Sequence, residues 1–136
     1  MEPSQKARIL VVDDEPDITA VMKRALENAG HKVDTFNNPE QALSNFNNGH
    51  YDMLLIDIRM PRMNGFQLFR EIRKRDSKVK VCFMTSFEVY RGEFEKMFPD
   101  YDVKCFISKP VGMRDLQKIV ELELKTVSKH GSASSL

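Results

Sequence analysis

Three aspartates follow two apolar runs of the sequence, and this arrangement could carry chemistry. Asp13 and Asp14 come directly after the run 9–12, and Asp57 closes the run 54–57. An acid at the carboxyl end of a central parallel strand points into the crevice where α/β sheets bind ligands. If these two strands are neighbours, the three carboxylates converge on one small pocket.

Three carboxylates at one rim repel one another. Two unit charges about 4 Å apart cost roughly 4 kcal/mol at an effective dielectric constant near 20. Such a trio binds either protons or a cation, and oxygen ligands suit Mg²⁺, with Mn²⁺ as the alternative ion. A carboxylate can also act as a nucleophile and form an aspartyl phosphate.

The rest of the chain supplies elements that could hold such a site. Five strand-like segments alternate with five helix-like segments, and no segment repeats another. Strands are expected at 8–12, 32–36, 51–57, 79–84 and 103–108, and helices after Asp14, from Pro39, after Asn64, within 87–102 and over 113–127. The second strand is more polar than the first and is expected at an edge. Parallel strands with right-handed crossovers place helices on both faces, so the expected fold is α/β and doubly wound.

Length and composition indicate one ordinary domain. A chain of 136 residues can bury about two-thirds of its extended surface. Lys and Arg total 21 against 20 Asp and Glu, so no overall field favours nucleic acid or an anionic membrane. No apolar run approaches the ~18 residues of a membrane span and no signal-peptide hydrophobic region is seen, so a cytoplasmic location without membrane insertion is expected.

The two ends of the chain are expected to lie outside the domain. Residues 1–6 are predicted to be a disordered N-terminus, and residues 128–136 a flexible tail or linker remnant without apolar periodicity. The domain itself is expected over residues 7–127.

Cys82 and Cys105 both lie in apolar strand-like segments. Without a CxxC spacing the pair predicts neither a zinc site nor a disulfide framework. Core thiols are the expected state.

Four motifs, in this order, resemble those of the receiver domain of two-component response regulators. They are the pair Asp13-Asp14, Asp57 with the turn that follows it, the pair Thr85-Ser86, and Lys109-Pro110. The resemblance extends over about residues 7–127. It implies a single flavodoxin-like (βα)5 three-layer sandwich whose parallel sheet has the strand order 2-1-3-4-5.

The resemblance also implies how the acids act. Asp57 is the expected phosphoacceptor, taking a phosphoryl group from the phosphohistidine of a histidine kinase or of a phosphotransfer protein. Asp14, Asp57 and the backbone carbonyl of Arg59 are the expected direct Mg²⁺ ligands, and Asp13 is expected to act mainly through water. Lys109 supplies a second counter-charge, and its bond to Pro110 is expected to be cis, as is usual in the family.

A switch is implied as well. The Thr85 hydroxyl and the neighbouring Ser86 are expected to bind the phosphoryl oxygens, and Phe106 to fill the space that Thr85 leaves. Phe106 lacks the hydroxyl of the tyrosine frequent in the family, so switching would depend on packing. An unknown downstream protein is expected on the face formed by the fourth helix, the last strand and the last helix, and a homodimer is left open.

Two bulky residues are expected beside the phosphoryl group. Arg59 and Phe87 lie two residues beyond Asp57 and Thr85, and neither is an acid or amide that could orient water. We therefore expect slow spontaneous hydrolysis of the aspartyl phosphate.

Three functions compete. The leading one is a phospho-accepting switch, either stand-alone or a fragment of a larger regulator. The nine residues from Ser128 cannot supply a helix-turn-helix or an enzyme, so neither direct nucleic-acid binding nor a turnover activity is expected. The alternative is a degenerate receiver that serves as a phosphorylation-independent docking scaffold, against which the complete set of key residues argues. A phosphohydrolase of the haloacid dehalogenase type is disfavoured, because Arg59 stands where its second aspartate would be.

Overall fold

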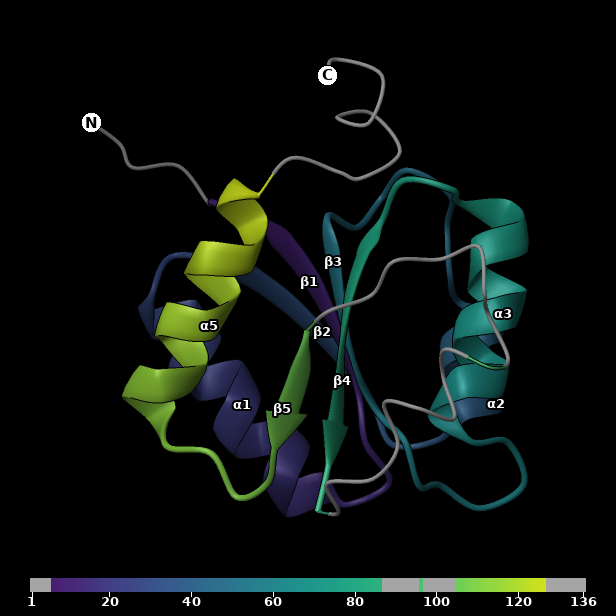
Figure 1. Cartoon of the computed structure of the whole chain (residues 1–136), viewed down its shortest axis with the longest axis horizontal. Helices are drawn as coiled ribbons and strands as arrows, with labels where there is room; N and C mark the ends of the chain where they lie inside the picture. The colour runs from purple at the N-terminus through teal and green to yellow at the C-terminus, as the bar shows by residue number, and fades with distance from the viewer. Residues whose placement is uncertain (1–5, 87–95, 97–104, 127–136) are drawn as a thin grey trace.

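The computed structural model describes residues 6–86, 96 and 105–126 (Figure 1). Within these residues strands and helices alternate along the chain. They are β1 (Arg8–Val12), α1 (Pro16–Asn28), β2 (Lys32–Phe36), α2 (Pro39–Ser44), β3 (Met53–Asp57), α3 (Gly65–Arg75), β4 (Lys80–Thr85), β5 (Phe106–Ser108) and α5 (Met113–Lys125). The helix expected within 87–102 lies outside the described residues.

The five strands form one parallel sheet in the order β2-β1-β3-β4-β5. This confirms the predicted order and places β2 at an edge. In the register of the two central strands Val12 lies opposite Ile56. Asp13 and Asp57, the residues that follow Val12 and Ile56, therefore lie next to each other at the carboxyl edge of the sheet.

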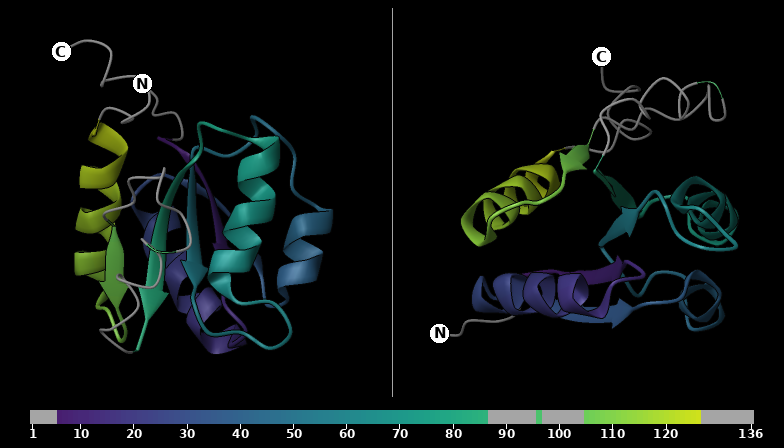
Figure 2. Two further views of the ribbon diagram at one scale, coloured as in Figure 1. Left: turned by 45° about the vertical axis from the view of Figure 1, so that its right-hand side comes forward. Right: turned by 90° about the horizontal axis from the view of Figure 1, so that it is seen from below.

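Helices cover both faces of the sheet. Figures 1 and 2 show α1 and α5 on one face and α2 and α3 on the other. Each face has its own apolar cluster, and alternate residues of β3 belong to different clusters. Leu54 and Ile56 join the cluster under α2 and α3, whereas Met53 and Leu55 join the cluster under α1 and α5. A strand buried on both faces reads as a continuous apolar run, which is why β3 could be recognised in the sequence. The architecture is the flavodoxin-like three-layer sandwich.

Capping fixes where α3 begins. The Asn64 side chain accepts a hydrogen bond from the Gln67 backbone N–H at 2.8 Å, and the Gln67 side chain accepts one from the Asn64 N–H at 2.9 Å. This reciprocal capping box satisfies donors at the first turn that have no partner within the helix. The helix then packs Leu68, Phe69 and Ile72 inward, fully buried.

Element ends differ from the sequence predictions by a few residues. β3 begins at Met53 rather than at Tyr51, and β5 begins at Phe106, while residues 103 and 104 of the predicted strand lie outside the described part. Tyr51 is nonetheless buried, and its hydroxyl donates to Asp34 Oδ2 at 2.7 Å. In the sequence, a buried residue next to a strand cannot be told from a buried residue within the strand.

The prediction of two core thiols is wrong, because Cys82 and Cys105 form a disulfide. β4 and β5 are neighbours, and their register pairs Phe83 with Phe106, so the two cysteines lie directly opposite each other. Their Cα atoms are 4.6 Å apart, which is within the range a disulfide spans. The prediction failed because the spacing of two cysteines in the sequence does not give the pairing of their strands.

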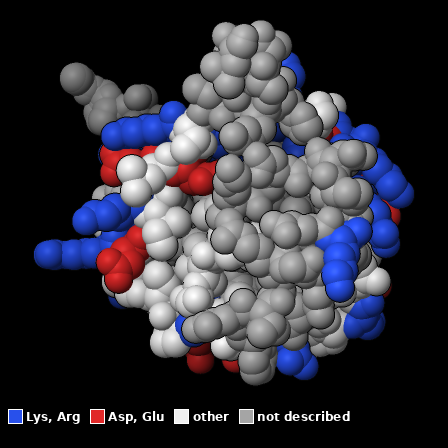
Figure 3. Space-filling view, in the orientation of Figure 1, with Lys and Arg blue, Asp and Glu red and all other residues white. Residues whose placement is uncertain are grey.

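The basic residues near the end of α3 serve the fold. Figure 3 shows basic side chains along the side of the molecule where α3 lies. Arg73 donates to the carbonyls of Asp76 and Val79, and Arg75 donates to the carbonyl of Leu43. Cations at a helix C-terminus are also favoured by the helix dipole. Among the described residues, no helix combines the length and the apolar character that a membrane span requires.

Candidate functional site

The carboxyl edge of the sheet brings the three predicted aspartates together. Asp13 follows β1 directly, Asp14 is next to it, and Asp57 is the last residue of β3. One carboxylate oxygen of each residue lies within 4.8 Å of those of the other two. Two adjacent strands in parallel register thus bring residues that are far apart in the sequence into one acidic cluster.

Two of the three acids are buried. Asp13 has no exposed surface and Asp57 is 5% exposed, whereas Asp14 is half-buried. Asp13 Oδ1 accepts from the Glu15 backbone N–H at 2.9 Å, and the Asn37 side chain donates to the Asp13 carbonyl at 2.8 Å. Asp13 is therefore held at both its backbone and its side chain.

One ammonium group faces the cluster. Lys109 Nζ donates to Asp13 Oδ2 at 2.9 Å and lies 3.4 Å from Asp57 Oδ2 and 3.8 Å from Glu15 Oε1. Its side chain is 11% exposed. The Lys109–Pro110 peptide bond is cis, and the Lys109 backbone N–H donates to the Thr85 carbonyl at 2.8 Å. The end of β5 and the bond that follows it thus hold the lysine over the acids.

The electrostatics show that the acids are only partly compensated. Burial and the Asp13 carboxylate raise the pKa of Asp57 to about 6, although Lys109 opposes the rise. Burial lowers the pKa of Lys109, but the hydrogen bond to Asp13 and the charge of Asp57 raise it overall. Because the pKa of Asp57 is raised overall, the Lys109 ammonium does not offset burial and the neighbouring carboxylates, and the site favours a proton or a cation.

A pocket of about 230 Å³ opens above the cluster. Its lining is polar and consists of Asp14, Glu15, Asp57, Arg59, Ser86 and Lys109. The other predicted site residues lie around it: Thr85 is buried at the end of β4, and Phe106 is half-buried with its ring centre 5.8 Å from that of Phe83. Phe87 lies outside the described residues.

Sequence reasoning missed two residues here. Glu15 adds a fourth carboxylate to the pocket, and its position directly after Asp14 was the available signal. Gly65 passes so close to the end of β3 that a Cβ there would lie 2.4 Å from the Asp57 backbone oxygen. A glycine after the turn residue Asn64 gives no sequence signal for such a close approach.

These features define a class of protein. A doubly wound parallel sheet presents a buried carboxylate, two further acids and a lysine in one small polar pocket at the carboxyl edge of its strands. Such a pocket suits a phosphoryl group and a divalent cation better than an apolar ligand.

Comparison with known proteins identifies the family. The sequence model of the response regulator receiver domain matches residues 9–121, and the chain belongs to this family. The response regulator receiver protein CpdR of Brucella abortus is 34% identical over 114 residues, which are 84% of this chain and 93% of that protein. Receiver domains take a phosphoryl group from histidine kinases or phosphotransfer proteins, and they generally bind Mg²⁺ at their acidic pocket.

Solved structures agree. The response regulator TrrA of Thermotoga maritima, in complex with Mg²⁺-BeF, has a TM-score of 0.72 and 31% identity over 86% of this chain and 98% of that one. The non-phosphorylated HemR receiver domain of Leptospira biflexa has the same fold, with a TM-score of 0.78 and 23% identity over 90% of this chain and 97% of that one.

Many curated relatives are much longer than this chain. For several of them, among them sensor kinases and transcriptional regulators, the chain spans only 7% to 42% of the relative's length. The match to these proteins therefore concerns their receiver portion.

Proposed function

We propose that this receiver is phosphorylated on Asp57 by a phosphohistidine of a histidine kinase or phosphotransfer protein. The observation that carries the proposal is the buried Asp57 carboxylate, with the Lys109 ammonium 3.4 Å away and a polar pocket above it. In the reaction an Asp57 oxygen bonds to phosphorus as the bond from phosphorus to the histidine nitrogen breaks. The imidazole leaves and takes up a proton. Because a loose phosphoryl-transfer transition state needs little covalent help, the surrounding residues serve to position the reacting groups and to neutralise the charge of the phosphoryl oxygens.

The acidic cluster fits Mg²⁺. Oxygen donors from three carboxylates, one of them with a raised pKa, are a set whose repulsion a divalent cation relieves. Asp14, Asp57 and the Arg59 backbone carbonyl would bind the ion directly, with Asp13 acting mainly through water. When bound, Mg²⁺ supplies counter-charge to the phosphoryl oxygens. That a related receiver is found with Mg²⁺-BeF supports this assignment, and Mn²⁺ would suit the same oxygen ligands.

Lys109 supplies the second counter-charge. In the unphosphorylated state its ammonium bonds to Asp13 at 2.9 Å, and only a small movement would bring it to a phosphoryl oxygen on Asp57. The Thr85 hydroxyl and Ser86 would donate to the remaining oxygens, since Ser86 lines the pocket and Thr85 precedes it.

The same contacts would transmit the signal. If Thr85 moves toward the phosphoryl group, Phe106 can follow it inward, since Phe106 is half-buried beside Phe83 and lies one strand away. Phosphorylation would then change the surface of β5 and α5. A Thr85→Ala variant should accept the phosphoryl group yet show no change in amide exchange at β5. A normal exchange response in this variant would contradict the switch.

We also propose that the aspartyl phosphate hydrolyses slowly. Arg59 lines the pocket, and it offers no carboxylate or amide to orient an attacking water. Phe87 is proposed to flank the other side. Introducing an amide with Arg59→Asn should shorten the lifetime of the phosphorylated form, whereas a wild-type lifetime of seconds would contradict the proposal.

The wider setting stays a prediction. We propose a cytoplasmic signalling protein without turnover activity of its own, either stand-alone or part of a larger regulator, with a domain over residues 7–127. Its downstream partner would bind the face that includes β5 and α5; the fourth helix expected on this face lies outside the described residues. Leu122 on α5 is 60% exposed and could contribute to this face or to a homodimer.

The direct test is incubation with acetyl phosphate and Mg²⁺, followed by intact-mass measurement. Wild-type protein should gain roughly 80 Da, the mass of one phosphoryl group. Asp57→Asn and a sample with excess chelator should not. If wild-type protein gains nothing, even with a phosphorylated histidine kinase as donor, the pocket is not used for phosphotransfer and the docking-scaffold alternative takes the lead.

A further inference from the structure

The Cys82–Cys105 disulfide lies in the apolar cluster under α1 and α5, on the face of the sheet opposite to Phe83 and Phe106. Cys82 is in the middle of β4 and has no exposed surface, and Cys105 directly precedes β5 and is 8% exposed. The proposed phosphotransfer uses neither sulfur. This pair is therefore a buried group of known reactivity that the function does not explain.

The disulfide joins the shortest strand to the rest of the sheet. β5 has three residues and pairs only with β4 among the described strands. Two backbone hydrogen bonds flank it: the Phe83 N–H donates to the Cys105 carbonyl at 3.0 Å, and the Lys109 N–H donates to the Thr85 carbonyl at 2.8 Å. A short edge strand with few hydrogen bonds opens easily when no other bond holds it.

Lys109 follows β5 directly, so the same strand carries the cation of the acidic pocket. The disulfide holds the start of β5, and Lys109 at its end reaches Asp13 and Asp57. A covalent bond at one end of a three-residue strand limits how far the other end can move.

We propose that Cys82 and Cys105 are a reversible redox site that tunes the acidic pocket through β5. In the oxidised form the disulfide holds β5 and Lys109 in place. In the reduced form β5 is held by its hydrogen bonds and packing alone, and Lys109 is less well fixed. The effect on phosphorylation rests on the proposed function, whereas the effect on β5 does not.

The chemistry is thiol–disulfide exchange with a small disulfide, such as glutathione disulfide, as the oxidant. One thiol loses its proton and attacks the small disulfide, which releases one small thiol and leaves a mixed disulfide. The second thiolate then displaces the other small thiol and forms the Cys82–Cys105 bond. Two electrons pass from the cysteines to the oxidant, and a dithiol reductant reverses both steps.

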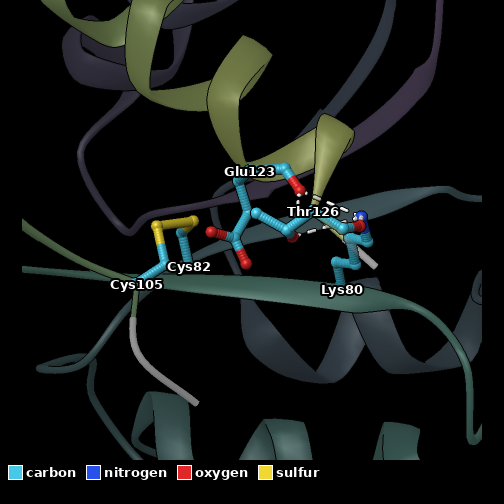
Figure 4. Close-up of a disulfide and its surroundings, with 5 residues drawn as sticks. All are labelled: Lys80, Cys82, Cys105, Glu123 and Thr126. Atoms are coloured by element: carbon cyan, nitrogen blue, oxygen red, sulfur yellow. Dashed lines mark hydrogen bonds between the residues drawn. A yellow bond between two sulfur atoms is a disulfide. The ribbon is translucent and has the colours of Figure 1, made fainter. Parts of the chain in front are cut away.

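The surroundings indicate that this exchange is slow. Figure 4 shows the Glu123 side chain of α5 beside the disulfide, and a carboxylate oxygen of Glu123 lies within 4.8 Å of the sulfurs. Lys80 at the start of β4 donates to the carbonyls of Glu123 and Thr126, which holds this end of α5 over the pair. A neighbouring carboxylate disfavours a thiolate, and burial restricts access. Cys105, the more exposed of the two, is the sulfur that we expect to react first.

The same three residues also match a cluster that could bind a metal ion. In the oxidised form, however, the sulfurs are bonded to each other and are not thiolate ligands. Within the described residues the cluster offers three donors, one fewer than the four of a structural zinc site. The disulfide explains the geometry without a metal ion.

The test compares amide hydrogen exchange in protein equilibrated with glutathione disulfide and in protein equilibrated with a dithiol. In the reduced form the amides of Phe83 and Lys109 should exchange at least about tenfold faster. Amides at the far side of the sheet, in β2, should not change. Alkylation of denatured samples should find no free thiol in the oxidised protein and two in the reduced protein.

A double variant, Cys82→Ala with Cys105→Ala, is the matched control. It should exchange like the reduced protein under both conditions. Phosphorylation by acetyl phosphate should be slower in reduced than in oxidised wild-type protein and independent of redox conditions in the double variant.

Two outcomes would overturn the proposal. One is a pair that stays alkylatable after equilibration with the oxidant, and the other is equal exchange at Phe83 and Lys109 in both forms. Failure of the proposed function would look different: neither redox form would be phosphorylated, while the exchange rates would still differ.

Discussion

At Asp57 the position of the residue in the fold directly affects the reactivity of its carboxylate. It ends a fully buried strand, is 5% exposed and lies beside a second buried carboxylate. Burial and Asp13 raise its pKa to about 6. When no cation is bound, the Asp57 carboxylate is therefore charged near neutral pH in the folded protein. This charge costs more free energy in the folded protein than in the unfolded chain.

This cost predicts a pH-dependent gain in stability for Asp57→Asn. The folded-state pKa is raised, so stability is lost as pH rises from about 3.8, the ordinary value, through about 6. In chelator, the Asp57→Asn variant should unfold at a temperature a few degrees above that of wild type at about pH 7.5, and this advantage should shrink toward about pH 4. Thermal unfolding across this pH range measures it, with Glu27→Gln on the exposed surface of α1 as the control. Equal melting temperatures at the higher pH would mean that Asp57 is not destabilising.

We expect substitution of Lys109 to have two effects of opposite sign. It pairs with Asp13 at 2.9 Å and lies 3.4 Å from Asp57, so Lys109→Gln removes the ammonium that contacts both of these acids. Mg²⁺ should bind several-fold more tightly, because the carboxylates then repel one another uncompensated. Phosphorylation at saturating Mg²⁺ should nevertheless slow by at least about tenfold, because a counter-charge to the phosphoryl group is lost. Calorimetric titration measures the Mg²⁺ affinity, and a phosphorylation time course measures the rate. A loss of both Mg²⁺ binding and phosphorylation would instead indicate a damaged pocket.

At the scale of elements, the connection from β3 to α3 fixes the phosphoacceptor. The Gly65 N–H donates to the Ile58 carbonyl at 2.8 Å, and the capping box at Asn64 sets the start of the helix. The chain passes so near the end of β3 that only glycine fits. The backbone of Asp57 is thus packed directly against the first residue of α3.

Gly65→Ala should consequently disturb both the fold and the site. A Cβ 2.4 Å from the Asp57 carbonyl oxygen forces backbone to move, which we expect to cost about 1–3 kcal/mol and to weaken Mg²⁺ binding. Gly112→Ala is the matched control, because the same atom there meets nothing within 4 Å. Urea unfolding and Mg²⁺ titration of the two variants provide the comparison. Equal behaviour would contradict the close approach.

Elements that bury one continuous face were predictable from sequence. β1 and β3 read as apolar runs, and α3 carries both its cap and its inward stripe in the sequence. The convergence of Asp13 and Asp57 followed, since each comes at the end of such a run. The resemblance implied that Lys109 would face the acids. Its contact with Asp13 in particular, the fourth carboxylate at Glu15 and the approach of Gly65 did not follow, because they depend on distances across the pocket.

At the scale of the whole molecule, the strand order was predictable through the family resemblance, but the disulfide was not. Cys82 and Cys105 are opposite only because β5 pairs with β4 in one register, and their separation of 23 residues does not encode that register. Two apolar segments with one cysteine each are equally compatible with separate core thiols. Side-chain bonds between strands therefore need the three-dimensional structure.

The measurement that tests the central claim most directly locates the phosphoryl group. Wild-type protein treated with acetyl phosphate and Mg²⁺ is reduced with borohydride, which converts an aspartyl phosphate to homoserine, and its peptides are then sequenced by mass spectrometry. We predict homoserine at position 57 alone, and only when both phosphodonor and metal are present. Homoserine at position 13 or 14, or at none of the three positions in protein that has gained a phosphoryl group, would contradict Asp57 as the phosphoacceptor.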